Sequence, residues 1–202
     1  MPRLPPNKSQ GAGKLRIWTI GHSNHPFEHF ANLLRKYEIE VVVDVRSVPY
    51  SRFSPQFRKE SLVAALKAAN IQYLFLGAEL GGRPQDMSFY DSDGRVLYGR
   101  LAESPPFQSG IERLQTGAGE YRCAIMCSEE DPAGCHRHLL VGRVLTRIDM
   151  KVSHLRGDER IQSFDEIELQ ILQSNQHSEG LFEVASQSDW KSPSPIRRRS
   201  ST

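Results

Sequence analysis

Residues 41–45 read Val-Val-Val-Asp-Val, and this run is β-branched at every position except Asp44. A near-continuous β-branched run is typical of a strand buried on both faces, as in a parallel sheet covered by helices on each side. Apolar runs at 15–20, 71–76, 121–127 and 151–155 predict further strands, and segments with helical spacing at 26–37, 61–69, 136–148 and 164–172 alternate with them. This alternation implies parallel pairing with right-handed crossovers. We therefore predict an α/β fold, a three-layer sandwich with a mostly parallel sheet of about five strands.

The segments outside this pattern predict loops and chain ends. Residues 47–57 contain two prolines and predict a loop, residues 77–95 predict an irregular segment, and short helices are expected between 96 and 115. We expect a flexible leader at 1–14, a single α/β domain at 15–173 and a disordered tail at 174–202. The tail is rich in Ser, Gln and Pro and carries Arg197, Arg198 and Arg199 near its end.

Charge and cysteine usage restrict the functional classes. The 202-residue chain has a net charge of +2, which is too balanced to indicate nucleic-acid binding from bulk charge alone. No apolar run approaches the ~20 residues needed to span a bilayer, and the N-terminus lacks the apolar stretch of a secretory signal. Three clustered cysteines, Cys123, Cys127 and Cys135, are typical of a reducing compartment. We expect a cytoplasmic protein without membrane contacts, and its oligomeric state stays open.

Polar residues with chemical potential follow four of the predicted strands. Ligands of open α/β sheets bind outside the carboxyl ends of the strands, so these residues predict one composite site. The set comprises His22 and Ser23 after the first strand, Asp44, Arg46, Ser51 and Arg52 after the second, Gly81, Gly82 and Arg83 after the third, and Cys127, Glu129, Cys135, His136 and Arg137 after the fourth.

Each residue type in this set has a role that it can fill. His22, Asp44 or Glu129 can act as general acid or base, and Cys127 or Cys135 as nucleophile. The arginines, with Ser23, Ser51, Gly81, Gly82 and His136, are candidates for binding an anionic ligand. Structural alternatives stand beside these roles: Asp44 can brace a loop, and Arg46 and Arg52 can form salt bridges with Asp44 or Glu79. Cys123 is expected to fill the core.

The string Cys135-His136-Arg137 is the sharpest local signal. A thiol at a helix N-terminus beside His and Arg has a lowered pKa, which suits a nucleophile or a metal ligand. Cys127, Cys135 and His136, with His22, are therefore candidate ligands of a metal cofactor, which stays open. Paired Cys-x-x-Cys knuckles of structural zinc sites are absent from the sequence. On a helix, the adjacent Cys135 and His136 would point about 100° apart, which is unfavourable for binding one ion.

These motifs together resemble a known family. Thr19-Ile20-Gly21-His22-Ser23, Asp44-Val45-Arg46 with Pro49 and Ser51, Leu80-Gly81-Gly82-Arg83, and Cys127-x-Glu129 with Cys135-His136-Arg137 are similar to those of the bacterial domain of unknown function 488, over roughly residues 15–160. The resemblance implies a compact α/β fold and a prokaryotic cytoplasmic protein, and it brings no established reaction. Some members carry a DNA-repair label.

Three functions follow as hypotheses. The first is an enzyme, a hydrolase or transferase, acting on a phosphate-bearing ligand such as a nucleotide or nucleic acid. The second is a non-enzymatic nucleotide or nucleic-acid binding module, related to DNA repair. The third is a metal-dependent enzyme with a Cys/His site. We favour the first, because catalytic sites need proton carriers with tuned pKa values and simple anion-binding sites need fewer of them.

Overall fold

A single six-stranded sheet organises the domain, in the order β3-β2-β4-β1-β5-β6. The computed structural model describes residues 14–176 and 190–196. Five strands run parallel and β6 is antiparallel to β5, so the predicted α/β sandwich with a mostly parallel sheet is confirmed. The strands are β1 (Arg16–Gly21), β2 (Val41–Asp44), β3 (Gln72–Phe75), β4 (Cys123–Cys127), β5 (Lys151–Leu155) and β6 (Ile161–Ser163). The sequence analysis did not include β6, because three residues are too short to show a period.

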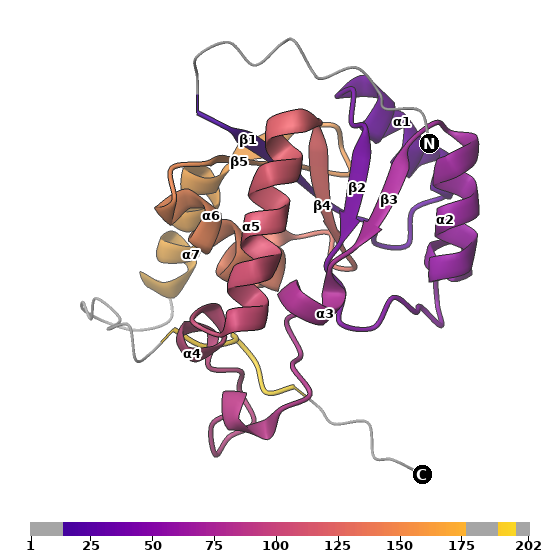
Figure 1. Cartoon of the computed structure of the whole chain (residues 1–202). Helices are drawn as coiled ribbons and strands as arrows, with labels where there is room; N and C mark the ends of the chain where they lie inside the picture. Colours follow the sequence, from indigo (N-terminus) through magenta and orange to yellow (C-terminus); the bar gives the residue numbers. More distant parts are fainter. Residues whose placement is uncertain (1–13, 177–189, 197–202) are drawn as a thin grey trace.

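Two hydrophobic clusters, one on each face of the sheet, explain the valine run in β2. Val42 packs on one face with α1 (Phe27–Lys36) and α2 (Lys59–Ala68). Val41, Val43 and Val45 pack on the other face, where α5 (Pro105–Glu120) and the helix formed by η4 (Arg137–Gly142) and α6 (Arg143–Arg147) lie (Figure 1). Alternate β2 side chains thus enter different cores, as expected for a strand covered on both sides.

The segment between β3 and β4 contains more helix than the sequence indicated. Short helices were expected between 96 and 115, and the structure has α4 (Tyr98–Ala102) followed by the 16-residue α5. A further short helix, α3 (Gly77–Leu80), lies in the segment expected to be irregular. Glycines interrupt the apolar pattern of α5, which makes its full length hard to predict from the sequence. Gly110 allows α5 to pack closely on α3, because a Cβ there would lie 2.8 Å from side-chain atoms of Glu79 and Leu80. The remaining elements are the 3-10 turns η1 (Pro55–Phe57), η2 (Met87–Phe89) and η3 (Pro132–Gly134), and the last helix α7 (Phe164–Gln176).

Residues 190–196 fall in the segment expected to be disordered, yet they pack on the domain. Trp190 is buried, its ring lies edge-on to Tyr98, and its Nε1 donates a hydrogen bond to the Leu139 carbonyl at 2.7 Å. The guanidinium groups of Arg143 and Arg147 lie over the Trp190 ring. Residues 174–176 of the expected tail belong to the last turn of α7. Residues 177–189 and 197–202 of the tail, including Arg197–Arg199, and residues 1–13 of the expected leader lie outside the described residues. Among the residues that are described, no helix is long and apolar enough to cross a membrane.

The order of the strands places a topological switch point between β1 and β4. These two strands are neighbours, but the chain leaves β1 toward α1 on one face and leaves β4 toward η4 on the other. The carboxyl ends of strands at such a point are where α/β proteins bind ligands. Here the loops after the two strands are in contact, since the His22 backbone N–H donates to the Cys127 carbonyl at 2.9 Å. The loops after β1, β2 and β4 meet at this edge.

Candidate functional site

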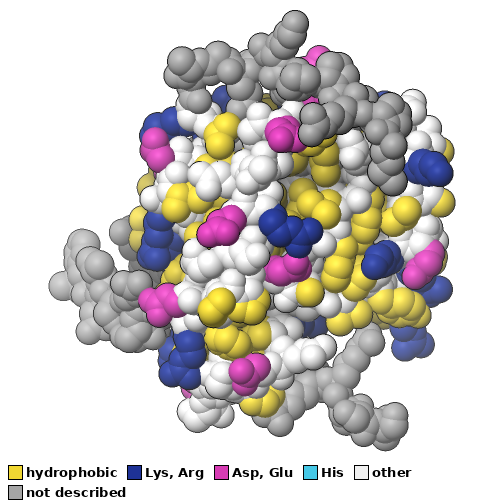
Figure 2. Space-filling view, in the orientation of Figure 1, with side chains coloured by type: hydrophobic (Ala, Val, Ile, Leu, Met, Phe, Trp, Pro, Cys, Tyr) yellow, Lys and Arg dark blue, Asp and Glu magenta, His cyan; other side chains and the backbone are white. Residues whose placement is uncertain are grey.

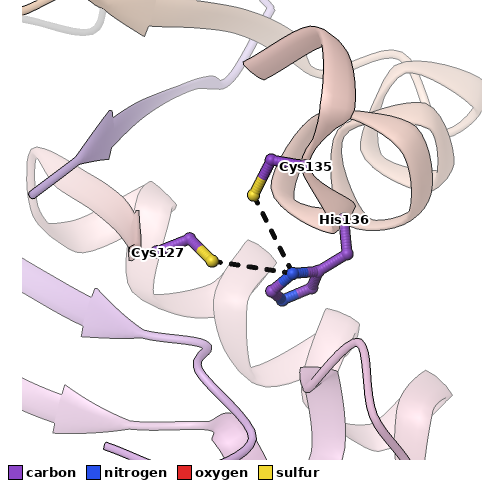
Figure 3. Close-up of side chains that lie close together, drawn as sticks. All are labelled: Cys127, Cys135 and His136. Carbon is purple, nitrogen blue, oxygen red and sulfur yellow. Dashed lines mark hydrogen bonds between the residues drawn. The ribbon is translucent and has the colours of Figure 1, made fainter. Parts of the chain in front are cut away.

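Two thiols and an imidazole meet at the carboxyl end of β4 (Figure 3). Cys127 is the last residue of β4, Cys135 follows the turn η3, and His136 directly precedes η4. The Nδ1 atom of His136 lies 3.6 Å from the Cys127 sulfur and 3.9 Å from the Cys135 sulfur. The three ligand atoms all lie within 4.8 Å of one another. We term these residues the Cys–His cluster.

The backbone at Cys135 explains how two adjacent residues reach one centre. Cys135 has an extended conformation, with φ −111° and ψ 139°, whereas His136 is already helical, with φ −59° and ψ −22°. The expected angle of about 100° between adjacent side chains holds only when both residues are helical. The expectation that this adjacency is unfavourable was therefore wrong, because the helix begins after Cys135.

Two backbone groups hold the His136 ring in place. Its Nε2 lies 3.0 Å from the Val45 carbonyl oxygen at the end of β2. Because a carbonyl only accepts, Nε2 carries a hydrogen, and Nδ1 is the ring nitrogen that faces the two sulfurs. Gly82 lies against the opposite part of the ring, where a Cβ would be 2.6 Å from His136 Cγ. The Gly81-Gly82 pair thus permits a close backbone approach, and the partner approached is a side chain of the site.

The two thiols of the cluster have opposed acidities. A hydrogen bond with Cys135 and then burial raise the pKa of Cys127 well above its ordinary value. Burial opposes ionisation of Cys135, but the hydrogen bond from Cys127 and the positive charge of Arg137 outweigh it and place the Cys135 pKa well below its ordinary value. The hydrogen bond between the thiols and the charge of Arg137 thus favour a thiolate at Cys135 over one at Cys127.

A buried ion pair lies beside the cluster at the end of β2. Asp44 accepts hydrogen bonds from Arg46 Nε at 2.9 Å, Arg46 Nη2 at 2.7 Å and the Arg46 backbone N–H at 3.1 Å. The Tyr73 hydroxyl donates a further bond of 2.9 Å to the same carboxylate. Burial, followed by the charge of Asp44, raises the Tyr73 pKa, so this hydroxyl stays protonated.

His22 completes this ion-pair group. Its Nδ1 lies 2.6 Å from the Ser23 carbonyl, so Nδ1 carries the hydrogen, and Nε2 accepts from Arg46 Nη1 at 3.1 Å. The ring stacks on Phe57 with the ring centroids 4.3 Å apart. Burial lowers the His22 pKa to about 4, against the Ser23 bond, which raises it. His22 is therefore neutral at pH 7.

Arg46 and Arg137 are both occupied by partners within the domain. Arg46 bonds Asp44, His22 and the Phe57 carbonyl, so the structure has the salt bridge that was the alternative to anion binding. Arg137 is fully buried and donates to the Glu129 and Glu130 carbonyls at 2.5 and 2.6 Å. Its Nε has no hydrogen-bond partner among the described residues. Arg137 thus holds the loop after β4, and its charge acts on both thiols.

The comparison with known proteins gives one match. The sequence matches the family described as domain of unknown function DUF488 over residues 26–144, more than half of the chain. The chain belongs to this family. No curated protein and no solved structure matches it. The matched range includes Asp44, Arg46 and the whole Cys–His cluster, whereas His22 precedes it.

Other predicted residues of this DUF488 domain lie at the surface. The side chains of Arg52, Arg83 and Glu129 are exposed. Neither Arg52 nor Arg83 has a side-chain hydrogen bond or ion pair to any other residue that the structure describes, so both guanidinium groups are open to a ligand. Ser51 Oγ accepts from the Ser54 backbone N–H at 3.0 Å, and Ser23 Oγ lies 3.4 Å from Asn24 Oδ1. Gly82 lies against the His136 ring of the Cys–His cluster, whereas Gly81 packs against Gly77 and Ser47.

Tyr98 is a site residue of the DUF488 domain that the sequence did not indicate. It is buried in α4, and burial followed by the charges of Cys135 and Cys127 raises its pKa. The charge of Arg83 acts in the opposite direction on the same hydroxyl. A tyrosine in an apolar segment carries no pattern that separates a site residue from a core residue. Cys123 lies in the core, where burial raises its pKa to about 12.

Proposed function

We propose that this DUF488 domain is a metal-dependent hydrolase of phosphate-bearing substrates, with one transition-metal ion held by the Cys–His cluster. The observation that carries the proposal is the spacing of the three ligand atoms. Tetrahedral zinc binds sulfur at about 2.3 Å and imidazole nitrogen at about 2.0–2.1 Å, so a sulfur and a nitrogen on the same ion are about 3.6 Å apart. The corresponding distances are 3.6 Å for Cys127 and 3.9 Å for Cys135.

The surroundings of His136 support the same proposal. Histidines that bind metals usually donate their other ring N–H to a carbonyl or carboxylate, which fixes the tautomer and the orientation of the ring. His136 has this arrangement through its 3.0 Å contact with the Val45 carbonyl. A histidine that only filled space beside two thiols would not need Nδ1 turned toward both of them.

The number of protein ligands indicates catalysis over a structural role. Structural zinc sites take four protein ligands, whereas catalytic sites take three and keep a position for water or substrate. Within the described part of the chain, the cluster is the one group of His, Cys, Asp or Glu side chains close enough to bind an ion, and it has three members. A metal ion lowers the pKa of its bound water to about 7 and so supplies a nucleophile for hydrolysis at neutral pH.

The preference for a phosphate-bearing substrate rests on the arginines that remain open. Arg83 is exposed, and it directly follows Gly82, whose backbone lies against the His136 ring of the cluster. A planar guanidinium binds phosphate oxygens in a bidentate manner, which positions a substrate as well as neutralising its charge. Arg83 is thus placed to hold a substrate beside the cluster.

Elemental analysis tests the metal directly. Protein purified without a metal-binding tag under reducing conditions is expected to contain one equivalent of a transition metal, and Cys135→Ser is expected to lose it. Cys123→Ser is the matched control, because Cys123 lies in the same strand as Cys127 but in the apolar core. Metal-free wild type that gains none after incubation with zinc, iron or cobalt would refute the proposal, as would equal metal content in Cys135→Ser.

Gly82→Ala tests the geometry without removing a ligand. The new methyl group would lie 2.6 Å from His136 Cγ, so the ring must move. Changes around metal-binding histidines lower metal affinity by about 10–100-fold, and the same loss is expected here in a competition titration with a chromogenic chelator. Gly119→Ala is the control, because a Cβ at Gly119 would meet no described atom within 4 Å. Equal affinities of the two variants would contradict the assigned role of His136.

A second candidate is a metal-free reaction with Cys135 as nucleophile, which its lowered pKa favours. Hydrolysis of the chromogenic diester bis(p-nitrophenyl) phosphate separates the candidates. Activity that is lost on chelation and restored by metal supports the first. Activity that persists after chelation and is abolished by iodoacetamide labelling of Cys135 supports the second. Stabilisation by nucleotides without turnover in either form would favour the binding module.

A further inference from the structure

The loop that follows β2 exposes large hydrophobic side chains. Phe53 is 89% exposed, Val48 62% and Tyr50 50%, and Phe53 is the most exposed large hydrophobic residue among those described. Residues 47–59, here termed the basic–aromatic loop, also contain Arg52, Arg58 and Lys59 and no acidic residue. Aromatic and basic side chains presented together on one surface are unusual for a loop that only connects two elements.

The exposure of Phe53 is not the result of a loosely held chain. The Ser54 backbone N–H donates to Ser51 Oγ at 3.0 Å, and Ser54 Oγ donates to the Ser23 carbonyl at 3.2 Å. Gln56 Nε2 donates to the His25 carbonyl at 2.8 Å, and Phe57 is fully buried. The residues on either side of Phe53 are thus anchored to the domain, and the fold presents Phe53 to the outside.

Cations flank the exposed aromatic rings. The Arg58 guanidinium lies 4.7 Å from the centre of the Tyr50 ring, and its Nε donates to the Ser51 carbonyl at 3.1 Å. Arg58 therefore covers one face of Tyr50, which leaves Phe53 as the larger open ring. Arg52, next to Phe53, is exposed and makes no hydrogen bond or ion pair with its side chain in the described part of the chain.

The basic–aromatic loop lies next to the Cys–His cluster. Ser47 Oγ, at its start, accepts from the Arg83 backbone N–H at 2.9 Å, and Gly82 lies against the His136 ring. Figure 1 shows the chain between β2 and α2 passing below α2 and beside α3. In Figure 2, hydrophobic and basic side chains lie side by side in that lower right part of the molecule.

We propose that the basic–aromatic loop binds single-stranded nucleic acid, with a base stacked on Phe53 and the flanking phosphates held by Arg52 and Arg58. Single strands are bound by this combination of stacking surfaces and cations, whereas the bases of a duplex keep their faces hidden. The net charge of +2 does not oppose this, because residues 47–59 themselves carry three basic residues and no acidic one. The inference names the phosphate-bearing substrate of the proposed hydrolase and in that respect rests on the proposed function, but binding itself needs no metal.

Fluorescence anisotropy with a labelled oligo(dT), and with a duplex of the same length, tests this surface. The full-length protein is expected to bind the single strand more tightly than the duplex. Phe53→Ala is expected to weaken binding by about 5- to 150-fold, since one base–aromatic stack contributes about 1–3 kcal/mol, and Phe53→Trp is expected to retain binding. Arg52→Ala is expected to weaken binding and to reduce the slope of log K against log salt by about 0.7.

Control variants separate this surface from general changes. Leu172→Ala removes an exposed hydrophobic side chain from α7, on the opposite side of the molecule in Figure 1, and is expected to bind as wild type does. Equal binding of the single strand by wild type and Phe53→Ala, or no binding at low salt, would overturn the inference. Sedimentation that shows a dimer abolished by Phe53→Ala would assign the surface to a second copy of the chain instead.

The metal-free Cys135→Ser protein makes the two proposals separable. If it binds oligo(dT) as wild type does, the loop binds nucleic acid whether or not the cluster is a metal centre. If metal analysis succeeds and no variant of the loop affects oligonucleotide binding, the proposed function stands and this inference fails.

Discussion

Arg46 can either stabilise the fold through its ion pair with Asp44 or bind an anionic ligand. The two roles predict different effects of removing its guanidinium group on stability and on ligand binding. Asp44 is 0% exposed and Arg46 3% exposed, so the pair is fully removed from water. Arg46→Met keeps the length of the side chain but removes the donors of the 2.9 and 2.7 Å bonds to Asp44 and the donor to His22. The carboxylate would then keep only the Arg46 backbone N–H and the Tyr73 hydroxyl.

The expected loss of stability is large. Removing one partner of a buried ion pair costs about 3–5 kcal/mol, because an uncompensated charge remains in the interior. For a domain of about 150–250 residues each kcal/mol lowers Tm by about 2–4 °C, so Arg46→Met is expected to melt about 6–20 °C below wild type. Urea unfolding at pH 7, followed by far-UV circular dichroism, measures the free energy by linear extrapolation.

A double variant checks the reason for this loss. If the unpaired carboxylate is responsible, Asp44→Asn combined with Arg46→Met should be more stable than Arg46→Met alone, because no buried charge remains. Arg52→Met is the matched control, since Arg52 is exposed and its removal is expected to change stability by less than about 0.5 kcal/mol. An Arg46→Met protein of wild-type stability that no longer binds phosphate-bearing ligands would refute the structural role.

Two further predictions concern other parts of the domain. Burial lowers the His154 pKa to about 2, so the folded state keeps this ring neutral while the unfolded chain takes up a proton below its ordinary value of 6.5. The free energy of unfolding is therefore highest above pH 6.5 and falls as the pH falls, by up to about 1.4 kcal/mol per pH unit from this group. Urea unfolding at several pH values between 6.5 and 4.5 should show a smaller slope of this free energy against pH for His154→Gln than for wild type. Equal slopes for the two proteins would contradict this. Trp190 is buried, and Trp190→Ala is expected to lower the free energy of unfolding by about 3 kcal/mol. The same variant is expected to speed hydrogen exchange of the Ser192 amide, which donates to the Val96 carbonyl. Unchanged exchange would show that Trp190 does not hold this segment.

The features of the fold that could be predicted are those set by burial. The four valines at 41–43 and 45 are predictable because their side chains enter two cores, and burial also produces the helical spacing of α1. β6 could not be predicted, because it is a three-residue edge strand whose residues are exposed or half-buried. The packing of Trp190 was missed for a different reason: it depends on Tyr98 and Leu139, which are distant in the sequence.

Because α/β sheets bind ligands at the carboxyl ends of their strands, the sequence predicted that the candidate residues lie at one edge of the sheet. It did not predict the role of each residue. In the parallel register Asp44 pairs with Met126 and Gly21 with Cys127, so the side chains after these strands must be neighbours. The arginines among them have identical chemistry in the sequence. Arg46 and Arg137 became internal donors, and Arg52 and Arg83 stayed exposed. That division depends on which carbonyls and carboxylates the loops place within reach, and no local pattern encodes it.

The position at which one helix begins decides the chemistry of the Cys–His cluster. Had the helix started one residue earlier, Cys135 would be helical and its sulfur would diverge from His136 by about 100°. The extended backbone of Cys135 separates η3 from the following helix, and the Val45 carbonyl and Gly82 then hold the ring from two other segments. Helix boundaries are the least certain part of any sequence-based prediction, and here a shift of one residue separates the proposed metal site from two diverging side chains. A candidate metal site that contains adjacent residues therefore has to be identified from the backbone angles at its first ligand.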